Sequence, residues 1–195
     1  MGPRRGVFSM ASRLADRIDI LVDLVGRLVA WLTLALVALV ALNVLARYLL
    51  SAGTVALQEL EWHLLAVTAL IGMSYGINRG EEVRVDMLYA RYGPRTKAIV
   101  DAAAGLMTVA VALLIMKVSF AYVAQSYAYQ EGSPDPGGLP FRYLLKSLIP
   151  LGFALLALQG FVEFVKALRR WPPAGPAALQ GTSHTTTMMG DGNGQ

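Results

Sequence analysis

The stretch QELEWHLLAVTALIGMSYGINRGEEVRVDMLYARY, residues 58–92, decides the fold. A collar with Glu59, Glu61 and Trp62 precedes an almost wholly apolar run over residues 64–77, and a loop dense in charge follows it. This order is typical of a helix that crosses a bilayer, because polar and aromatic residues favour the interfaces and apolar residues favour the hydrocarbon core. It predicts a membrane span over residues 55–78.

Three glycines give this span a distinctive face. Gly72, Gly76 and Gly80 recur every four residues, so they stack on one side of a helix. In lipid, small residues at this spacing allow two helix backbones to approach closely. The pattern predicts a packing face, either within this chain or against another subunit.

Composition extends the membrane interpretation to the whole chain. Of 195 residues, 55% are hydrophobic and only 15% are charged, with a mean hydropathy of +0.51. Soluble domains carry about 25% charged residues. The net charge is +4, but the basic residues flank apolar runs and form no separate stripe, so no nucleic-acid partner is predicted. The absence of cysteine excludes disulfides and thiol chemistry.

The first part of the chain predicts an amphipathic segment followed by a span. Over residues 1–27, apolar side chains such as Leu14 and Ile18 fall on one helical face, so we expect this segment to lie in the cytoplasmic interface before the chain turns in. A first span is predicted over residues 28–46. Near its end, Asn43 is expected to hydrogen-bond a neighbouring helix, and Thr54 is expected to cap the next one.

Two further spans are predicted over residues 98–120 and 146–167, so the transmembrane domain covers residues 28–170. A short interfacial helix is expected around Met87, and the Pro- and Gly-rich residues 132–140 must form a loop. Residues 171–195 have almost no charge and are expected to form a disordered cytoplasmic tail. The predicted fold class is an all-α membrane protein with four transmembrane helices and short interfacial amphipathic helices.

The distribution of Lys and Arg predicts the orientation. The termini and the loop between the second and third spans carry most of the basic residues, and cytoplasmic loops are enriched in them. Both termini are therefore predicted to be cytoplasmic, in a multi-pass protein of the bacterial inner membrane. The cytoplasmic set is Arg4, Arg5, Arg13, Arg17, Arg79, Arg84, Arg91, Arg95, Lys97, Lys166, Arg169 and Arg170; the opposite set is Arg47, Arg142 and Lys146, with Lys117 reaching towards it.

The middle of each span lacks ionisable residues. Leu36, Leu70, Val109 and Leu156 lie at the centres, and the charged residues lie near the ends. Pathways for ions or protons normally place charged residues near the midplane. The chain is therefore a poor candidate for a translocation pathway acting alone.

The inventory also argues against enzymatic and cofactor-binding functions. Haem bundles need paired inward histidines, but the chain has two histidines, and one of them, His184, lies in the predicted tail. Glu59 and His63 share a helix face, but two ligands without a third make a weak metal site. No hydrolase motif or phosphate-cradling loop is present. We predict no catalysis, no cofactor and no metal.

The order of several motifs resembles the small membrane subunit of tripartite ATP-independent periplasmic (TRAP) transporters, over nearly all of residues 20–170. One departure is Glu82, where family members often have a histidine, so no role of that histidine carries over. The motifs are Asn43-Val44 with Arg47-Tyr48, Glu59 with Glu61-Trp62, Gly72, the loop 79–86, SPDPGGLP at 133–140, Lys146 with Ile149-Pro150, and Leu158-Gln159-Gly160.

The resemblance implies a division of labour. A periplasmic binding protein captures an organic acid, a large membrane subunit carries it with an inward sodium gradient, and the small subunit supports the large one in the bilayer. No ATP or cofactor is implied. The candidate interface residues are Gly72, Gly76, Arg79, Arg84, Asp86, Glu59, Trp62 and Arg47.

Two other functions stay open at this point. A self-assembling four-helix channel or exchanger would need polar residues along a shared pore, and Thr68, Ser74, Thr108 and Gln159 are few and uncharged. A structural membrane assembly factor unrelated to transport is the second alternative.

Overall fold

The computed structural model describes residues 3–51, 53–81 and 86–171. Four long helices dominate it: α1 (Pro3–Leu49), α2 (Val55–Arg79), α4 (Pro94–Ala128) and α5 (Arg142–Arg169), with the short α3 (Asp86–Ala90) between α2 and α4. Within these described ranges, each long helix is long and apolar enough to cross a membrane. The prediction of an all-α membrane protein with four transmembrane helices is confirmed.

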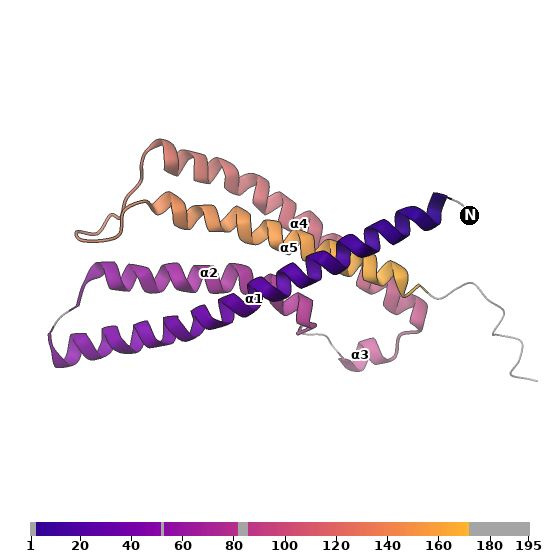
Figure 1. Cartoon of the computed structure of the whole chain (residues 1–195), viewed down its shortest axis with the longest axis horizontal. Helices are drawn as coiled ribbons and strands as arrows, with labels where there is room; N and C mark the ends of the chain where they lie inside the picture. Colours follow the sequence, from indigo (N-terminus) through magenta and orange to yellow (C-terminus); the bar gives the residue numbers. More distant parts are fainter. Residues whose placement is uncertain (1–2, 52, 82–85, 172–195) are drawn as a thin grey trace, which may run out of the picture.

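The long helices form two antiparallel hairpins, α1–α2 and α4–α5 (Figure 1). The hairpin end carries the connections 50–54 and 129–141, whereas α1 begins and α5 ends at the opposite, terminal end. Helix α5 also packs on α1 and α2, and therefore joins the hairpins. Both ends of the described chain thus lie on the same side of the four-helix body.

Local signals account for several helix ends. The Thr54 hydroxyl accepts a hydrogen bond from the Leu57 N–H at 3.4 Å, which confirms the predicted cap of α2. Gly80 ends α2 with φ of 71°, a conformation that glycine adopts without strain. Pro94 begins α4, where its missing N–H costs nothing.

The closest helix pair, α4 and α5, is held by small residues at a regular spacing. The side of α4 that is buried repeats every seven residues, a period that keeps one seam facing a neighbouring helix. At Gly105, a Cβ atom would stand 2.8 Å from the Phe164 backbone N and 3.0 Å from the Gly160 O. Close backbone approach supplies the dispersion contacts that hold helices together in lipid. The buried positions are Ala98, Gly105, Ala112, Ser119 and Ser126.

Helix α1 differs from the prediction at its N-terminal part. The chain was expected to lie along the interface over residues 1–27 and then to turn into the bilayer, but α1 is one uninterrupted helix from Pro3 to Leu49. In this part of α1, Ala15, Ile18 and Val22 pack against Val162 and Val165 of α5, whereas Leu14 of the predicted apolar face is 53% exposed. Only part of the predicted face is therefore used for tertiary packing.

The remaining boundaries can be compared with the predicted ones. The predicted spans 28–46, 55–78, 98–120 and 146–167 lie inside α1, α2, α4 and α5, which extend beyond them. The short helix expected around Met87 is α3, and residues 132–140 form no helix or strand. The predicted tail lies outside the described residues except for Trp171.

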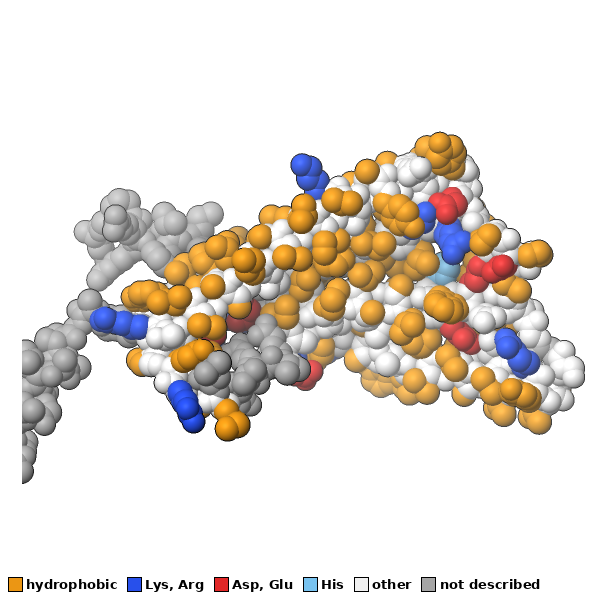
Figure 2. Space-filling model, turned by 180° about the vertical axis from the view of Figure 1, so that it is seen from behind, with side chains coloured by type: hydrophobic (Ala, Val, Ile, Leu, Met, Phe, Trp, Pro, Cys, Tyr) orange, Lys and Arg blue, Asp and Glu red, His pale blue; other side chains and the backbone are white. Residues whose placement is uncertain are grey.

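Side-chain types divide along the long axis. On the face in Figure 2, hydrophobic side chains cover the middle of the helices, and most charged side chains lie toward the two ends. Large apolar side chains such as Trp31, Leu34 and Leu114 are more than half exposed. An exposed apolar surface of this extent suits a lipid environment.

Candidate functional site

The glycine face of α2 is open. A Cβ atom on Gly72 or Gly76 would meet nothing within 4 Å, unlike one on Gly105. Other glycines make the close contacts between helices of this chain. Gly152 of α5 meets the Leu70 backbone of α2, and Gly26 of α1 meets the Tyr75 ring.

An apolar groove of about 540 Å³ lies beside this face. Met73, Gly76 and Ile77 of α2 form one wall. Helix α4 contributes Met107 and Val111 to the other, and Leu156 of α5 also lines the groove. Glu81 and Thr108 are the polar members of a lining that is otherwise apolar apart from Gly76.

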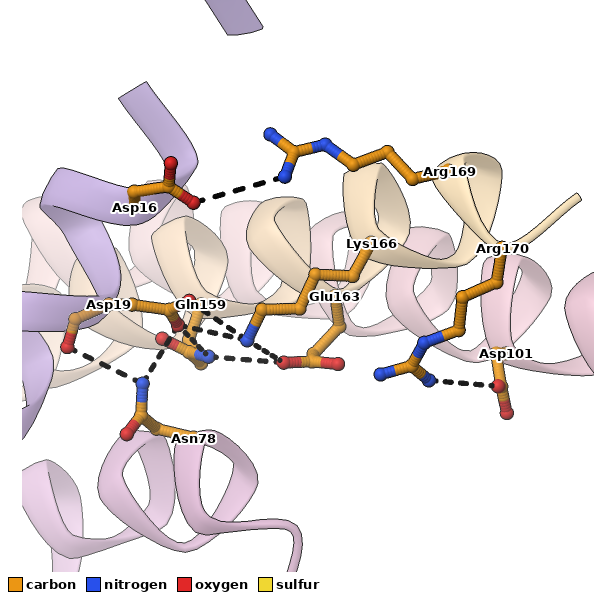
Figure 3. A network of polar contacts seen from close by, with 9 residues as sticks. All are labelled: Asp16, Asp19, Asn78, Asp101, Gln159, Glu163, Lys166, Arg169 and Arg170. Atoms are coloured by element: carbon orange, nitrogen blue, oxygen red, sulfur yellow. Dashed lines mark hydrogen bonds and ion pairs between the residues drawn. The ribbon is translucent and has the colours of Figure 1, made fainter. Parts of the chain in front are cut away.

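A polar cluster joins three helices near the terminal end (Figure 3). Asp19 of α1 accepts hydrogen bonds from Asn78 of α2 at 2.8 Å and from Gln159 of α5 at 3.1 Å, and its carboxylate lies 2.9 Å from the Lys166 Nζ. Lys166 also pairs with Glu163 at 2.8 Å. Hydrogen bonds to a charged group are stronger than neutral ones, so this cluster fixes where α1 crosses α5.

The cluster is flanked by weaker ion pairs. Arg169 lies 3.8 Å from Asp16 and Arg170 lies 3.7 Å from Asp101 (Figure 3). The Tyr89 hydroxyl donates to Asp101 at 3.0 Å, which ties α3 to α4. These contacts hold the terminal end together.

At the hairpin end, Glu59 anchors the long connection 129–141. Its carboxylate accepts hydrogen bonds from the Ser133 hydroxyl and from the Leu139 N–H. The connection passes close to this carboxylate at Gly138, where a Cβ atom would stand 2.8 Å from the Glu59 Oε2. Residues 132–140 form the predicted loop, and its backbone is held against α2.

Glu131 closes the base of the same connection. Its carboxylate accepts hydrogen bonds from Lys146 and from the Ser126 hydroxyl. These donors, the Lys146 ammonium first, hold the pKa of Glu131 below its usual range. Glu131 is therefore charged at neutral pH. The ammonium of its partner Lys146 also lies 4.0 Å from the centre of the Tyr122 ring.

The described candidate interface residues fall into two groups. Arg79 and Glu59 have partners within this chain: Arg79 lies 2.6 Å from Asp23 and donates to the Tyr75 hydroxyl at 3.1 Å. Among the described residues, Arg47 has no ion pair or side-chain hydrogen bond, and Trp62 is 64% exposed. Arg84 and Glu82 lie outside the described residues, as does the Asp86 side chain.

Two predictions about polar side chains can be compared with the structure. The Asn43 amide donates to Glu61 of α2 at 2.8 Å, which confirms the bond to a neighbouring helix. The His63 Nδ1 lies 2.6 Å from the backbone oxygen of Glu59, one turn earlier in α2. In the part of the chain that the structure describes, no three His, Asp or Glu residues are grouped to bind a metal.

Sequence reasoning missed the cluster around Asp19 and the seam of α4. Asp19 was not predicted to have a role, because its partners Asn78, Gln159 and Lys166 lie 59 to 147 residues away along the chain. The seam carried a visible signal, since Ala98, Gly105, Ala112, Ser119 and Ser126 are small residues at every seventh position.

Comparison with known proteins gives one family. The model described as "Tripartite ATP-independent periplasmic transporters, DctQ component" matches residues 36–170, which begin within α1 and end just after α5. No curated protein matches the chain.

Proposed function

Because this chain belongs to the DctQ family, the small membrane component of TRAP transporters, we propose that it supports the large transport subunit by packing against it in the bilayer. The family is one of transporter components and not of enzymes. The proposal extends to a sodium-coupled, binding-protein-dependent importer of an organic acid in the bacterial inner membrane. The resemblance of the motifs supports this extension.

The open glycine face carries the proposal. Gly72 and Gly76 leave space where a Cβ atom would stand, and the neighbouring groove is lined mainly by apolar side chains. A helix of the large subunit could therefore approach the α2 backbone closely and gain dispersion contacts. Arg84 and Asp86, in the connection after α2, are proposed to pair with charges of the same partner.

An accessory role also agrees with the absence of ionisable residues from the middle of each span. Leu36, Leu70, Val109 and Leu156 leave no charged side chain at the centre of any span. A channel or exchanger built from this chain alone would lack the ionisable groups on which such pathways depend. Membership of a transporter family argues against an assembly factor unrelated to transport.

Co-purification with the large subunit tests both the function and the surface. The tagged chain, extracted from its host in a mild detergent, is expected to retain a large multispan protein in stoichiometric amount. Gly72→Leu and Gly76→Leu are expected to lower the retained amount about tenfold or more, because each places a bulky side chain where the partner helix should lie. Mass spectrometry measures the ratio.

Ala41→Leu is the matched control, because Ala41 is exposed on α1 and the substitution adds a similar volume. It should leave the ratio unchanged. If the unmodified chain purifies alone, the accessory function is wrong. If the large subunit is retained by both glycine variants as well as by the control, the function stands and the glycine face is not the contact.

A further inference from the structure

A second, polar pocket lies at the hairpin end between α1 and α2. It has a volume of about 190 Å³, well above the roughly 10–15 Å³ that one water requires. Asn43, Val44, Arg47 and Tyr48 line it from the last turns of α1, and Gln58 and Glu61 line it from the first turns of α2. The groove beside Gly76 and this pocket are separate sites with different chemistry.

The pocket holds a cation and an anion that do not pair with each other. Arg47 forms no ion pair or side-chain hydrogen bond with any described residue, and Glu61 receives only the Asn43 amide at 2.8 Å. Asn43 is 5% exposed, and its Oδ1 has no hydrogen-bond partner in the described structure. The Glu61 carboxylate has capacity for further donors beyond the Asn43 amide, so a ligand that donates hydrogen bonds would be favoured here.

The position of the pocket is that of a lipid headgroup. Tyr48 and Trp62 are 81% and 64% exposed, and such aromatic residues mark membrane interfaces. One or two helical turns deeper, the apolar side chains of Val40, Val44 and Leu65 are exposed along the same helices. A molecule with its polar group in the pocket would therefore find an apolar surface for its chains.

We propose that this pocket binds the headgroup of phosphatidylethanolamine, in the leaflet opposite the chain termini. The Arg47 guanidinium binds the phosphate, and the primary ammonium donates hydrogen bonds to the Glu61 carboxylate, which also lines the pocket. A purely anionic headgroup would leave Glu61 facing a negative charge. The quaternary ammonium of phosphatidylcholine has no N–H group to donate.

Native mass spectrometry of the full chain in mild detergent tests the assignment, with phosphatidylethanolamine, phosphatidylcholine or phosphatidylglycerol added at equal concentration. The unmodified chain is expected to bind phosphatidylethanolamine about tenfold more tightly than either other lipid. This comparison needs no variant, so it does not depend on the folding of a mutant. Equal binding of the three lipids would overturn the proposal.

Two variants separate the two charges. Arg47→Gln is expected to lower phosphatidylethanolamine binding about tenfold. Glu61→Gln keeps an acceptor for the Asn43 amide, and it is expected to remove the preference over phosphatidylcholine. Lys117→Gln is the control, since Lys117 is another exposed cation without an ion pair among the described residues. A loss as large in Lys117→Gln as in Arg47→Gln would show nonspecific attraction and overturn the site.

Free phosphoethanolamine distinguishes a lipid from a soluble ligand. At the concentration used for the lipid it should not displace phosphatidylethanolamine, because it lacks the chains that would cover Val40, Val44 and Leu65. Displacement at that concentration would overturn the assignment to a lipid. Binding of phosphatidylglycerol that depends on Arg47 and equals that of phosphatidylethanolamine would overturn the role of Glu61.

Discussion

At the scale of single residues, Asp19 has the most consequential contacts in the chain. One carboxylate receives hydrogen bonds from Asn78, Gln159 and Lys166, so it connects α1 with α2 and α5. Its side chain is 24% exposed and that of Lys166 is 27% exposed, so water screens the pair only in part. Gln159 is fully buried and depends on this carboxylate and on Glu163 for its amide bonds.

Asp19→Ala should therefore destabilise the fold by about 2 kcal/mol, because it leaves the buried Gln159 amide short of an acceptor and weakens the pairing of Lys166. Reversible unfolding in mixed micelles would measure the change. Asp23→Ala is the control: Asp23 pairs with Arg27 and Arg79, whose side chains are 66% and 43% exposed, so its loss should cost less than about 1 kcal/mol. Equal losses in the two variants would contradict the special position of Asp19.

At the scale of the helices, glycines differ in their surroundings: some lie in tight contact with another helix of this chain and others face open space. Gly105 lies in the seam of α4, where the backbone of α5 leaves no room for a methyl group, whereas Gly72 faces open space. In the isolated chain, Gly105→Ala should destabilise the fold by about 1–3 kcal/mol through overpacking. Gly72→Ala should be neutral or stabilise it by up to about 1 kcal/mol, because alanine is the better helix former.

The same unfolding measurement in detergent compares these two variants. Both substitutions add one methyl group to a helical glycine, so intrinsic helix propensity cancels in the comparison. A similar change in stability for Gly105→Ala and Gly72→Ala would mean that the α4–α5 seam is looser than the distance of 2.8 Å to the Phe164 N implies.

How far the sequence predicts these elements depends on the range of the interactions involved. The apolar runs and the Thr54 cap are local signals, and each predicted element around them is present, whereas Gly80, predicted to lie on the glycine face, ends α2 in a left-handed conformation. Residues 1–27 show the limit: Ile18 of the predicted apolar face packs on α5 but Leu14 of the same face is 53% exposed, because a pattern alone does not distinguish an interfacial lipid surface from the side of α5. The partners of Asp19 were beyond reach for the same reason.

The interface candidates also show that contacts between residues far apart in the sequence are not predicted from local patterns. Glu59 and Arg79 were selected because they are charged and near the ends of a span, yet each has partners inside this chain. For Gly72 and Gly76 the sequence pattern allows packing either within this chain or against another subunit. The open space beside them supports packing against another subunit. From the sequence, Arg47 is an interface candidate and Asn43 is expected to hydrogen-bond a neighbouring helix. The pocket that both residues share with Glu61 is not visible in the sequence, because it forms only when the hairpin brings α1 and α2 together.

At the scale of the whole molecule, the two ends of the bundle differ in charge, and this difference predicts its orientation in the membrane. The terminal end and the connection between α2 and α4 hold most of the Lys and Arg residues, and the hairpin end holds Arg47, Arg142 and Lys146. Short loops rich in basic residues remain in the cytoplasm. The connection 129–141 should then face the periplasm, where a binding protein would arrive.

Because the chain contains no cysteine, a single introduced thiol reports this orientation without background. Asp135→Cys, on the exposed part of the connection 129–141, should react with a membrane-impermeant maleimide in intact spheroplasts. Arg91→Cys, exposed between α3 and α4, should react only after the membrane is disrupted. The unmodified chain controls for labelling of other groups, and gel shift or mass spectrometry measures the extent. The reverse pattern would place the termini in the periplasm and would direct the Glu59-anchored connection away from any periplasmic partner.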